Sequence, residues 1–381
     1  MSLSVSSAFD GGNIRLVAIE GNRVDLEIVK DHQSDFYQWF YFRLTGGAGQ
    51  ELELRLLNCA GSAYPHGWEN YRACVSEDRE EWQRVDSDYR GGVLTISLTP
   101  AANSVWIAYF APYTMERHHD LVASVVQHPA IAHRSLGQTL DGQELDYFRL
   151  GDGPLQVWIY ARQHPGETMA EWWMEGALEK LLDDSDPVSR RLREKASFHI
   201  VPNMNPDGSR RGHLRTNAVG TNLNREWHDP SPERSPEVLY VRDEMDRTGV
   251  DFAMDVHGDE AIAANFLAGF EGIPSWNPEQ GALFDKYSDA LERLSPDFQT
   301  EKGYTVAEPG KANMSMSTAQ LAERFGAVSM TLEMPFKDNQ ELPDPVYGWS
   351  PDRCGTLARS CLDALHAIVD DLEERRAALK R

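Results

Sequence analysis

The chain has 381 residues, of which 41% are hydrophobic and 25% charged, and its formal net charge is −23. This balance is that of a folded globular protein, and the length predicts two domains because single cores rarely grow so large. The negative charge argues against nucleic acid or an anionic membrane as a partner, since like charges repel.

The four cysteines predict neither a disulfide scaffold nor a thiolate metal site. Cys59, Cys74, Cys354 and Cys361 include no C-x-x-C pair, so we expect buried, reduced thiols. The N-terminal segment lacks the basic and apolar regions of a signal peptide, and no stretch approaches the roughly 20 apolar residues of a membrane span. We therefore expect a cytoplasmic protein with no membrane or nucleic-acid partner, and the oligomeric state stays open.

Residues 1–117 predict a small all-β antiparallel sandwich domain. Short alternating or aromatic-rich runs recur there, turn residues separate them, and no long helical pattern intervenes. The expected strands are IRLVAI, RVDLEIV, FYQWFYFRL, ELELRLL, GVLTISL and SVWIAYF.

Residues 118–381 predict an α/β domain, a mixed sheet flanked by helices. Apolar strand-like runs alternate here with helical stretches, which is typical of this class. The expected strands cover 155–161, 198–204, 251–256 and 327–333. The expected helices cover 169–182, 235–247, 282–294, 318–325 and the tail from residue 353.

The first chemical motif is Gln163-His164-Pro165-Gly166-Glu167, directly after the strand 155–161. A His and a Glu three residues apart, in a turn that leaves a strand, can point at one ion. Imidazole nitrogen and carboxylate oxygen are common ligands of catalytic zinc. The Pro-Gly pair fixes a tight turn and sharpens the signal. Taken alone, the motif is also explained by a surface histidine beside a surface glutamate.

A third ligand is predicted at His257, which closes the strand 251–256. In open α/β sheets ligands bind outside the carboxyl ends of the strands, where His164, His257 and Glu333 all lie. Glu333 suits a general base, because a carboxylate beside a metal site can take a proton from water and pass it to a leaving amine. The plain alternatives are a core histidine and a solvated glutamate.

A polar segment, residues 203–227, follows another strand end and is dense in Asn, Gly and Arg. Arg215, Asn224 and Arg225 offer what a substrate carboxylate needs, because guanidinium groups bind carboxylate bidentately and an amide adds an oriented donor. A further arginine could stabilise the oxyanion that forms when water attacks a carbonyl. A long polar loop on the surface is the alternative.

The ordered motifs resemble those of the M14 metallocarboxypeptidases. H-P-G-E, N-P-D-G, G-x-x-L-N-R-x-W, D-x-H-G and T-L-E follow one another over about residues 120–340, and YRACVSEDREEWQRV and AYFAPYT are similar to the N-terminal domain of the cytosolic carboxypeptidase branch, in a bacterial-type member. The resemblance implies one zinc ion per chain, a peptide or protein C-terminus as substrate, and a role for each matching residue. It implies His164, Glu167 and His257 as zinc ligands, Glu333 as the catalytic glutamate, Arg215 as the residue that polarises the scissile carbonyl, and Asn224 and Arg225 as the pair that binds the terminal carboxylate.

Three departures from the family pattern bear on this expectation. Asn222 stands where many members have an Asp that supports a zinc histidine. Ser317 stands where glutamate-removing members are expected to carry an arginine, although Lys311 or Arg324 could replace it from nearby. The active-site tyrosine of the family has no clear match, and Tyr304 is the nearest candidate upstream of Glu333.

The sequence therefore predicts a zinc metallocarboxypeptidase that hydrolyses C-terminal peptide bonds. Two alternatives remain: a related amidase or deacylase acting on N-acyl amino acids, and a non-catalytic protein that binds C-terminal tails. The run His118-His119-Asp120 could be a metal cluster, and we interpret it instead as an interdomain surface.

Overall fold

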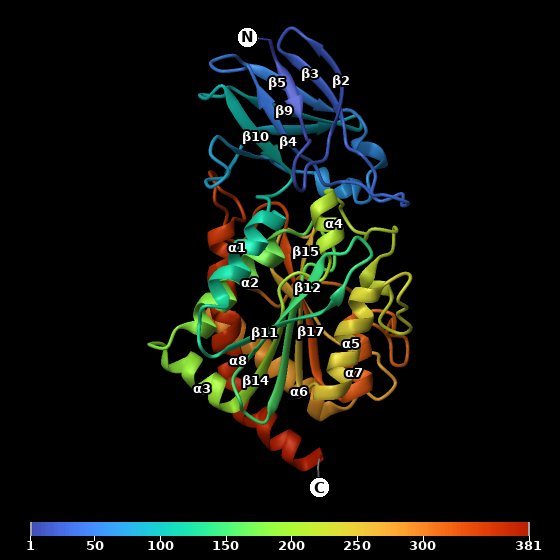
Figure 1. Cartoon of the computed structure of the whole chain (residues 1–381), viewed down its shortest axis with the longest axis vertical. Helices are drawn as coiled ribbons and strands as arrows, with labels where there is room; N and C mark the ends of the chain where they lie inside the picture. Colours follow the sequence, from blue (N-terminus) through green and yellow to red (C-terminus); the bar gives the residue numbers. More distant parts are fainter. Residues whose placement is uncertain (1, 380–381) are drawn as a thin grey trace.

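The computed structural model describes residues 2–379, and Figure 1 shows a β region stacked on a larger α/β region. The β region contains two five-stranded sheets, and their facing side chains form part of one hydrophobic core. Every strand pair in it is antiparallel except β3–β5, so the prediction of an antiparallel all-β sandwich is confirmed with one parallel exception. The first sheet has the order β1 (Ser4–Ser6), β4 (Tyr41–Thr45), β10 (Ser104–Ala108), β6 (Cys74–Ser76), β7 (Gln83–Arg84). The second has the order β2 (Arg15–Glu20), β3 (Arg23–Glu27), β5 (Leu52–Leu56), β9 (Val93–Leu98), β8 (Ser87–Arg90).

The α/β region is built on a seven-stranded mixed sheet, as the sequence predicts. Four central strands are parallel, so their carboxyl ends meet at one edge. The order is β11 (Ile131–Gln138), β12 (Glu144–Leu150), β14 (Ala196–Val201), β13 (Leu155–Ala161), β15 (Phe252–Asp259), β17 (Val328–Pro335), β16 (Phe266–Ala268).

Helices cover both faces of this sheet (Figure 1). One face packs against α2 (Met169–Leu182), α3 (Pro187–Lys195), α6 (Pro278–Leu294) and α8 (Pro351–Leu379). The other packs against α5 (Pro236–Thr248) and α7 (Ser317–Phe325), whose apolar side chains form a second core cluster. The remaining helices are α1 (Met115–Val125), which follows the β region, and the short α4 (Pro206–Arg211).

Two buried side chains of the β region bind loops that leave the central strands. Asp31 accepts hydrogen bonds from the backbone N–H groups of Leu214, Arg215 and Thr216, at 2.7, 2.8 and 2.9 Å. Arg84 donates to the carbonyl oxygens of Phe336 and Trp349, which follow β17. Backbone groups buried at a junction need such partners, so the β region fixes the loops at the carboxyl edge of the sheet.

The four cysteines are free and buried, which confirms that they form no disulfide scaffold. Within residues 2–379, no helix combines the length and the apolar character needed to cross a bilayer.

Candidate active site

The turn after β13 brings the H-P-G-E motif to the carboxyl edge of the sheet. Arg162 opens it with a φ of 61°, and its guanidinium lies buried under the turn, where Nε donates to the Pro165 carbonyl at 3.0 Å. Gly166 is needed for space, because a Cβ there would come within 2.9 Å of the Leu214 carbonyl oxygen. The turn therefore delivers His164 and Glu167 inward, onto the start of α2.

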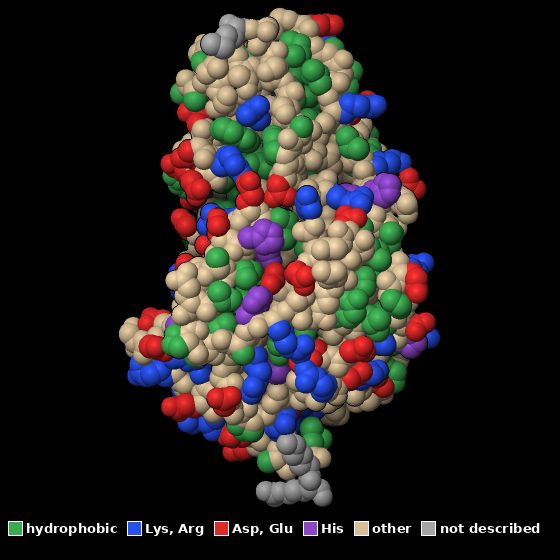
Figure 2. All heavy atoms as spheres, in the orientation of Figure 1, with side chains coloured by type: hydrophobic (Ala, Val, Ile, Leu, Met, Phe, Trp, Pro, Cys, Tyr) green, Lys and Arg blue, Asp and Glu red, His purple; other side chains and the backbone are tan. Residues whose placement is uncertain are grey.

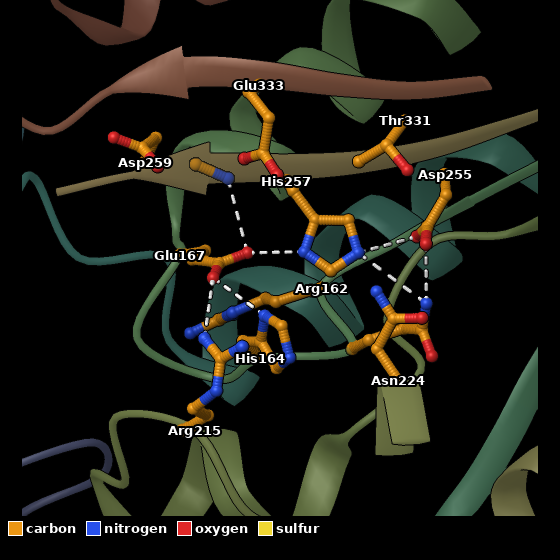
Figure 3. A network of polar contacts seen from close by, with 12 residues as sticks. Arg162, His164, Glu167, Arg215, Asn224, Asp255, His257, Asp259, Thr331 and Glu333 are labelled. Carbon is orange, nitrogen blue, oxygen red and sulfur yellow. Dashed lines mark hydrogen bonds and ion pairs between the residues drawn. The ribbon is translucent and has the colours of Figure 1, made fainter. Parts of the chain in front are cut away.

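His164, Glu167 and His257 form one buried cluster (Figure 3). Their potential ligand atoms lie within 4.8 Å of one another. The two Glu167 carboxylate oxygens are each 2.7 Å from an imidazole, one from Nδ1 of His164 and the other from Nδ1 of His257. Two imidazoles and a carboxylate form a ligand set typical of catalytic zinc, which leaves a fourth position open. The predicted metal ligands are thus brought together.

The protonation of this cluster follows from burial and neighbouring charge. Burial lowers the pKa of His164 to about 4, and Arg215 acts in the same direction, so its imidazole is neutral, the form that binds metal. Burial alone would raise the pKa of Glu167, but His164 and His257 hold it below its ordinary value. Glu167 is therefore a carboxylate at neutral pH.

The outer nitrogens of both histidines have polar partners. Nε2 of His164 lies 3.0 Å from Oδ1 of Asn222, so the neutral amide occupies the place of the expected Asp. Nε2 of His257 lies 2.9 Å from Oδ1 of the fully buried Asp255. Such partners set the orientation of a metal-binding imidazole. Asp255 is the aspartate of the D-x-H-G motif, but sequence reasoning gave it no role.

Ser317 completes this network on the far side of Asp255. Its Oγ lies 2.5 Å from Oδ2 of Asp255, which also accepts from the Gln163 amide at 2.6 Å. Arg324 points elsewhere, because it binds Asp246 through two contacts of 2.6 Å. The hypothesis that Arg324 replaces the missing arginine is therefore wrong.

Glu333 lies beside His257, because β15 and β17 pair these two residues in register. One of its carboxylate oxygens, Oε2, is buried without a hydrogen-bond partner among the described residues. Burial raises the pKa of Glu333 well above its ordinary value, although the charge of His257 acts against this. A buried carboxylate of raised basicity next to the metal cluster suits proton transfer.

Tyr304 also reaches the site, despite its weak sequence signal. Its hydroxyl lies 3.1 Å from Oε1 of Glu333 and 2.8 Å from Oδ2 of Asp259. The side chain remains half-exposed, at 47% of its accessible surface. It therefore stands at the mouth of the site, between Glu333 and solvent.

The three residues predicted to bind substrate lie around the same cluster. Nη1 of Arg215 is 3.9 Å from Oε1 of Glu167, and its guanidinium packs against the rings of Phe36 and Tyr64 from the β region. Asn224 is buried, and its Oδ1 accepts from the Ser317 N–H at 2.9 Å. Arg225 lies beside it and is exposed. Partial burial of the Arg225 side chain and the charge of Arg215 both lower the pKa of Arg225.

The interpretation of His118 as part of an interdomain surface is wrong. His118 is buried against α2, where Nδ1 lies 2.5 Å from Oε1 of Glu171 and Nε2 lies 3.1 Å from Oδ2 of Asp146. Glu171 also binds Arg162, the residue beneath the metal-binding turn, at 2.6 Å. Sequence reasoning missed this support because the pattern of apolar residues in α1 does not indicate which of its polar side chains are buried.

A buried pair of imidazoles and a carboxylate at the ends of parallel strands, with a second carboxylate beside them, defines the site of a metallohydrolase. Family models agree with this class. Residues 5–110 match the model described as "Cytosolic carboxypeptidase N-terminal domain", and residues 119–351 match the model described as "Zinc carboxypeptidase". The chain belongs to the zinc carboxypeptidase family, M14, and is a peptidase.

Several relatives match over nearly the whole chain. An uncharacterized protein of Zymomonas mobilis is 59% identical over 372 residues, covering 98% of each sequence. The crystal structure of a metallo-carboxypeptidase from Burkholderia cenocepacia is 44% identical, with a TM-score of 0.94 over 97% of this chain and all of that one. A metallo-carboxypeptidase from Pseudomonas aeruginosa, in complex with (2-guanidinoethylmercapto)succinic acid, is 40% identical, with a TM-score of 0.95 and the same coverage.

The eukaryotic relatives are much longer. Human cytosolic carboxypeptidase 1 is 30% identical in an alignment of 289 residues that covers 63% of this chain. The chain spans 24% of the length of that protein.

Proposed function

We propose that the protein is a zinc-dependent carboxypeptidase that hydrolyses the C-terminal peptide bond of a peptide or protein. The observation that carries the proposal is the meeting of His164, Glu167 and His257 in one buried cluster, with Glu333 paired beside His257. The three ligands would hold one zinc ion per chain. Zinc bound there would polarise the scissile carbonyl and make water a stronger nucleophile.

Glu333 takes the proton from the attacking water and delivers it to the leaving amine. Its raised pKa supports this double task, because a carboxylate of raised basicity accepts a proton more readily than an ordinary one and can return it as a carboxylic acid. Arg215 donates to the oxygen on which negative charge develops. Contact with Glu167 and the rings of Phe36 and Tyr64 holds its guanidinium at the site, which supports this role.

Arg225 and Asn224 bind the terminal carboxylate of the substrate. The exposed guanidinium of Arg225 presents a fork of donors beside the buried amide of Asn224, and the two residues are linked by a 2.6 Å hydrogen bond from Nη1 of Arg225 to the Asn224 carbonyl. The Ser317 N–H donates to Oδ1 of Asn224. The amide nitrogen of Asn224 is therefore the group that donates to the substrate carboxylate.

Two further expectations, on location and on domain division, accompany this proposal. Buried free thiols support a cytoplasmic location for the protein. We also retain residues 1–117 and 118–381 as the two domains, and the different sheets on either side of α1 support that division.

The test is a scan of peptides that differ in their last residue, with metal analysis of the same protein. The expected result is about one zinc per chain and release of single C-terminal residues. Arg225→Ala should raise KM for free C-termini and change little for amidated analogues, which lack the carboxylate. Turnover of N-acyl amino acids without peptides would indicate an amidase, and zinc binding without any turnover would indicate a tail-binding protein.

A further inference from the structure

A second concave site lies at the opposite end of the sheet from the metal cluster. Its volume is about 340 Å³, and it is open to solvent between the sheet and the end of α5. Gln156 and Ser197, near the starts of β13 and β14, contribute to its wall. The metal-binding turn follows the far end of β13, so the two sites are about 20 Å apart at the usual rise of a strand.

Three arginines surround this pocket, namely Arg134 on β11, Arg149 on β12 and Arg247 on α5. Strand register explains their convergence. Arg134 pairs directly with Tyr147, and Arg149 with His199, so these side chains share one face of the sheet. Figure 2 shows Lys and Arg side chains gathering on the lower half of the molecule, over the part of the sheet that Figure 1 labels β11 and β14.

The charges in the pocket do not cancel. Glu244, nearly buried, binds both Arg134, at 2.6 Å, and Arg247. Arg149 contacts only Asp152 and Ser197 among the described residues, at 3.3 and 3.4 Å, and Asp152 is 96% exposed. Each guanidinium carries five donors, and the contacts with Glu244, Asp152 and Ser197 use only some of them. A positive pocket in a chain of net charge −23 is not explained by its general surface composition.

The floor of the pocket is a rigid polar stack. His199 stacks on Trp158 with ring centroids 4.6 Å apart, and its two nitrogens bind Tyr147 and Gln156 at 2.6 and 2.8 Å. Burial lowers the pKa of His199 to about 4, and the three arginines add to this effect against Glu244. The floor is thus neutral and preorganised, and Glu244 fixes two of the arginines above it.

We propose that this pocket is a second ligand site, which binds a small molecule carrying a doubly charged oxyanion. Three guanidiniums less one carboxylate leave a charge that a dianion balances, and guanidinium groups match phosphate and carboxylate oxygens bidentately. The volume of about 340 Å³ suits a small molecule. The ligand class is a phosphate monoester or a dicarboxylate.

The test is calorimetric titration of the full chain with inorganic phosphate and, separately, with succinate, at constant ionic strength set by chloride. Saturable binding of either dianion is expected, and the stronger of the two identifies the source of the oxyanion. Arg149→Gln and, independently, Arg134→Gln should each weaken binding about tenfold, the effect of one lost charge-assisted contact. Arg134→Gln leaves Glu244 paired with Arg247, so the nearly buried carboxylate keeps an arginine partner.

Two matched variants separate this site from other anion binding. Arg90→Gln removes an exposed arginine of β8 that contacts Asp88, and should leave the affinity unchanged. Arg225→Ala removes the arginine proposed to bind a substrate carboxylate, so dianion binding that persists in this variant belongs to the pocket. The proposal is overturned if neither dianion binds at about 10 mM, or if binding is lost in Arg225→Ala and kept in both pocket variants.

Discussion

Burial makes the Glu333 carboxylate basic enough for the proton transfer proposed for it. Its Oε2 is buried with no hydrogen-bond partner among the described residues, while Oε1 lies beside Tyr304. A carboxylate placed in this way is a stronger base than one in water, because the protein does little to stabilise its charged form. Asp255 differs, because its Oδ2 accepts from Gln163 and Ser317 and its Oδ1 lies 2.9 Å from His257.

Glu333→Gln should therefore abolish turnover while leaving the fold and zinc content intact. The amide keeps the shape of the side chain but cannot accept a proton, and loss of a general base commonly reduces kcat by about 10²–10⁴-fold. The measurement is kcat on a cleaved peptide, with zinc content determined on the same sample. Near-normal turnover in a zinc-loaded variant would remove Glu333 from the mechanism.

At the scale of elements, the loop that carries Arg215 is held from outside its own domain. Asp31 lies in a β-region loop and binds three consecutive N–H groups, and a fourth bond of 3.0 Å comes from the hydroxyl of Thr216. Asp35, in the same loop, is exposed and pairs with Lys30. The two aspartates thus form a matched pair, one placed to position the site and one on the surface.

Asp31→Asn should lower kcat/KM by about 10–100-fold without loss of zinc, because displacement of a catalytic group by about 1 Å has effects of this size. It should also destabilise the fold by roughly 1–3 kcal/mol, the cost of leaving buried N–H groups without acceptors. Asp35→Asn is the control and should change neither. Equal kinetics for the two variants would show that the β region does not position Arg215.

The buried His118 gives the fold a dependence on pH. Burial alone would lower its pKa, but Glu171 and Asp146 outweigh burial and raise the pKa to about 9. Since the folded pKa exceeds the ordinary value of 6.5, the protonated imidazole stabilises the fold fully below about pH 6.5. This contribution is lost as the pH rises through about 9, and is of the order of 3 kcal/mol.

The urea midpoint of the wild-type protein should therefore fall between pH 6.5 and 9 more steeply than that of His118→Gln. His119→Gln replaces the exposed neighbour on α1 and should behave as the wild type. Parallel pH profiles for wild type and His118→Gln would show that the imidazole is neutral in the fold.

Which elements the sequence could predict depends on where their side chains point. The central strands β13, β15 and β17 are buried on both faces, so they read as apolar runs. The edge strand β11 is largely exposed and polar, and it went unpredicted. The first half of FYQWFYFRL forms no strand, and β4 begins only at Tyr41, because Phe40 and Trp39 pack as buried loop residues rather than pairing.

At the scale of the whole molecule, charge and pocket chemistry act together on substrate choice. Ser317, where the family resemblance implies an arginine for a glutamate side chain, instead contacts Asp255, and Arg324 pairs with Asp246. The net charge of −23 adds long-range repulsion toward an acidic tail. The protein therefore presents no evident cation for a terminal glutamate among these positions.

We expect weak or absent cleavage of polyglutamate tails. The measurement compares kcat/KM for peptides ending in Glu, Leu, Phe and Lys at low and moderate salt. Salt should improve the Glu peptide most, since exposed charges are screened over about 8 Å at physiological ionic strength. A preference for terminal Glu that persists at low salt would contradict this expectation, and Lys311 would then be the first residue to replace.

The metal ligands could be predicted because short motifs at strand ends carry them, whereas their supports could not. Asp31, Arg162 and His118 act through contacts between segments far apart in the sequence, such as the 183 residues that separate Asp31 from Leu214. Tyr304 lies on an irregular loop, where no periodicity predicts which way a side chain points. Local pattern thus identifies the chemistry, and tertiary contacts hold it in place.

The reactivity of the four buried thiols can report how often each part of the fold opens. Cys59 and Cys74 lie in the β region, and Cys354 and Cys361 lie on α8 at the back of the sheet. Burial raises the pKa of Cys59 and of Cys361 to about 12, so neither reacts as a thiolate while covered. Alkylation rates at each position therefore measure how often that part of the fold opens, and equal rates for the two pairs would mean that both regions unfold as one cooperative unit.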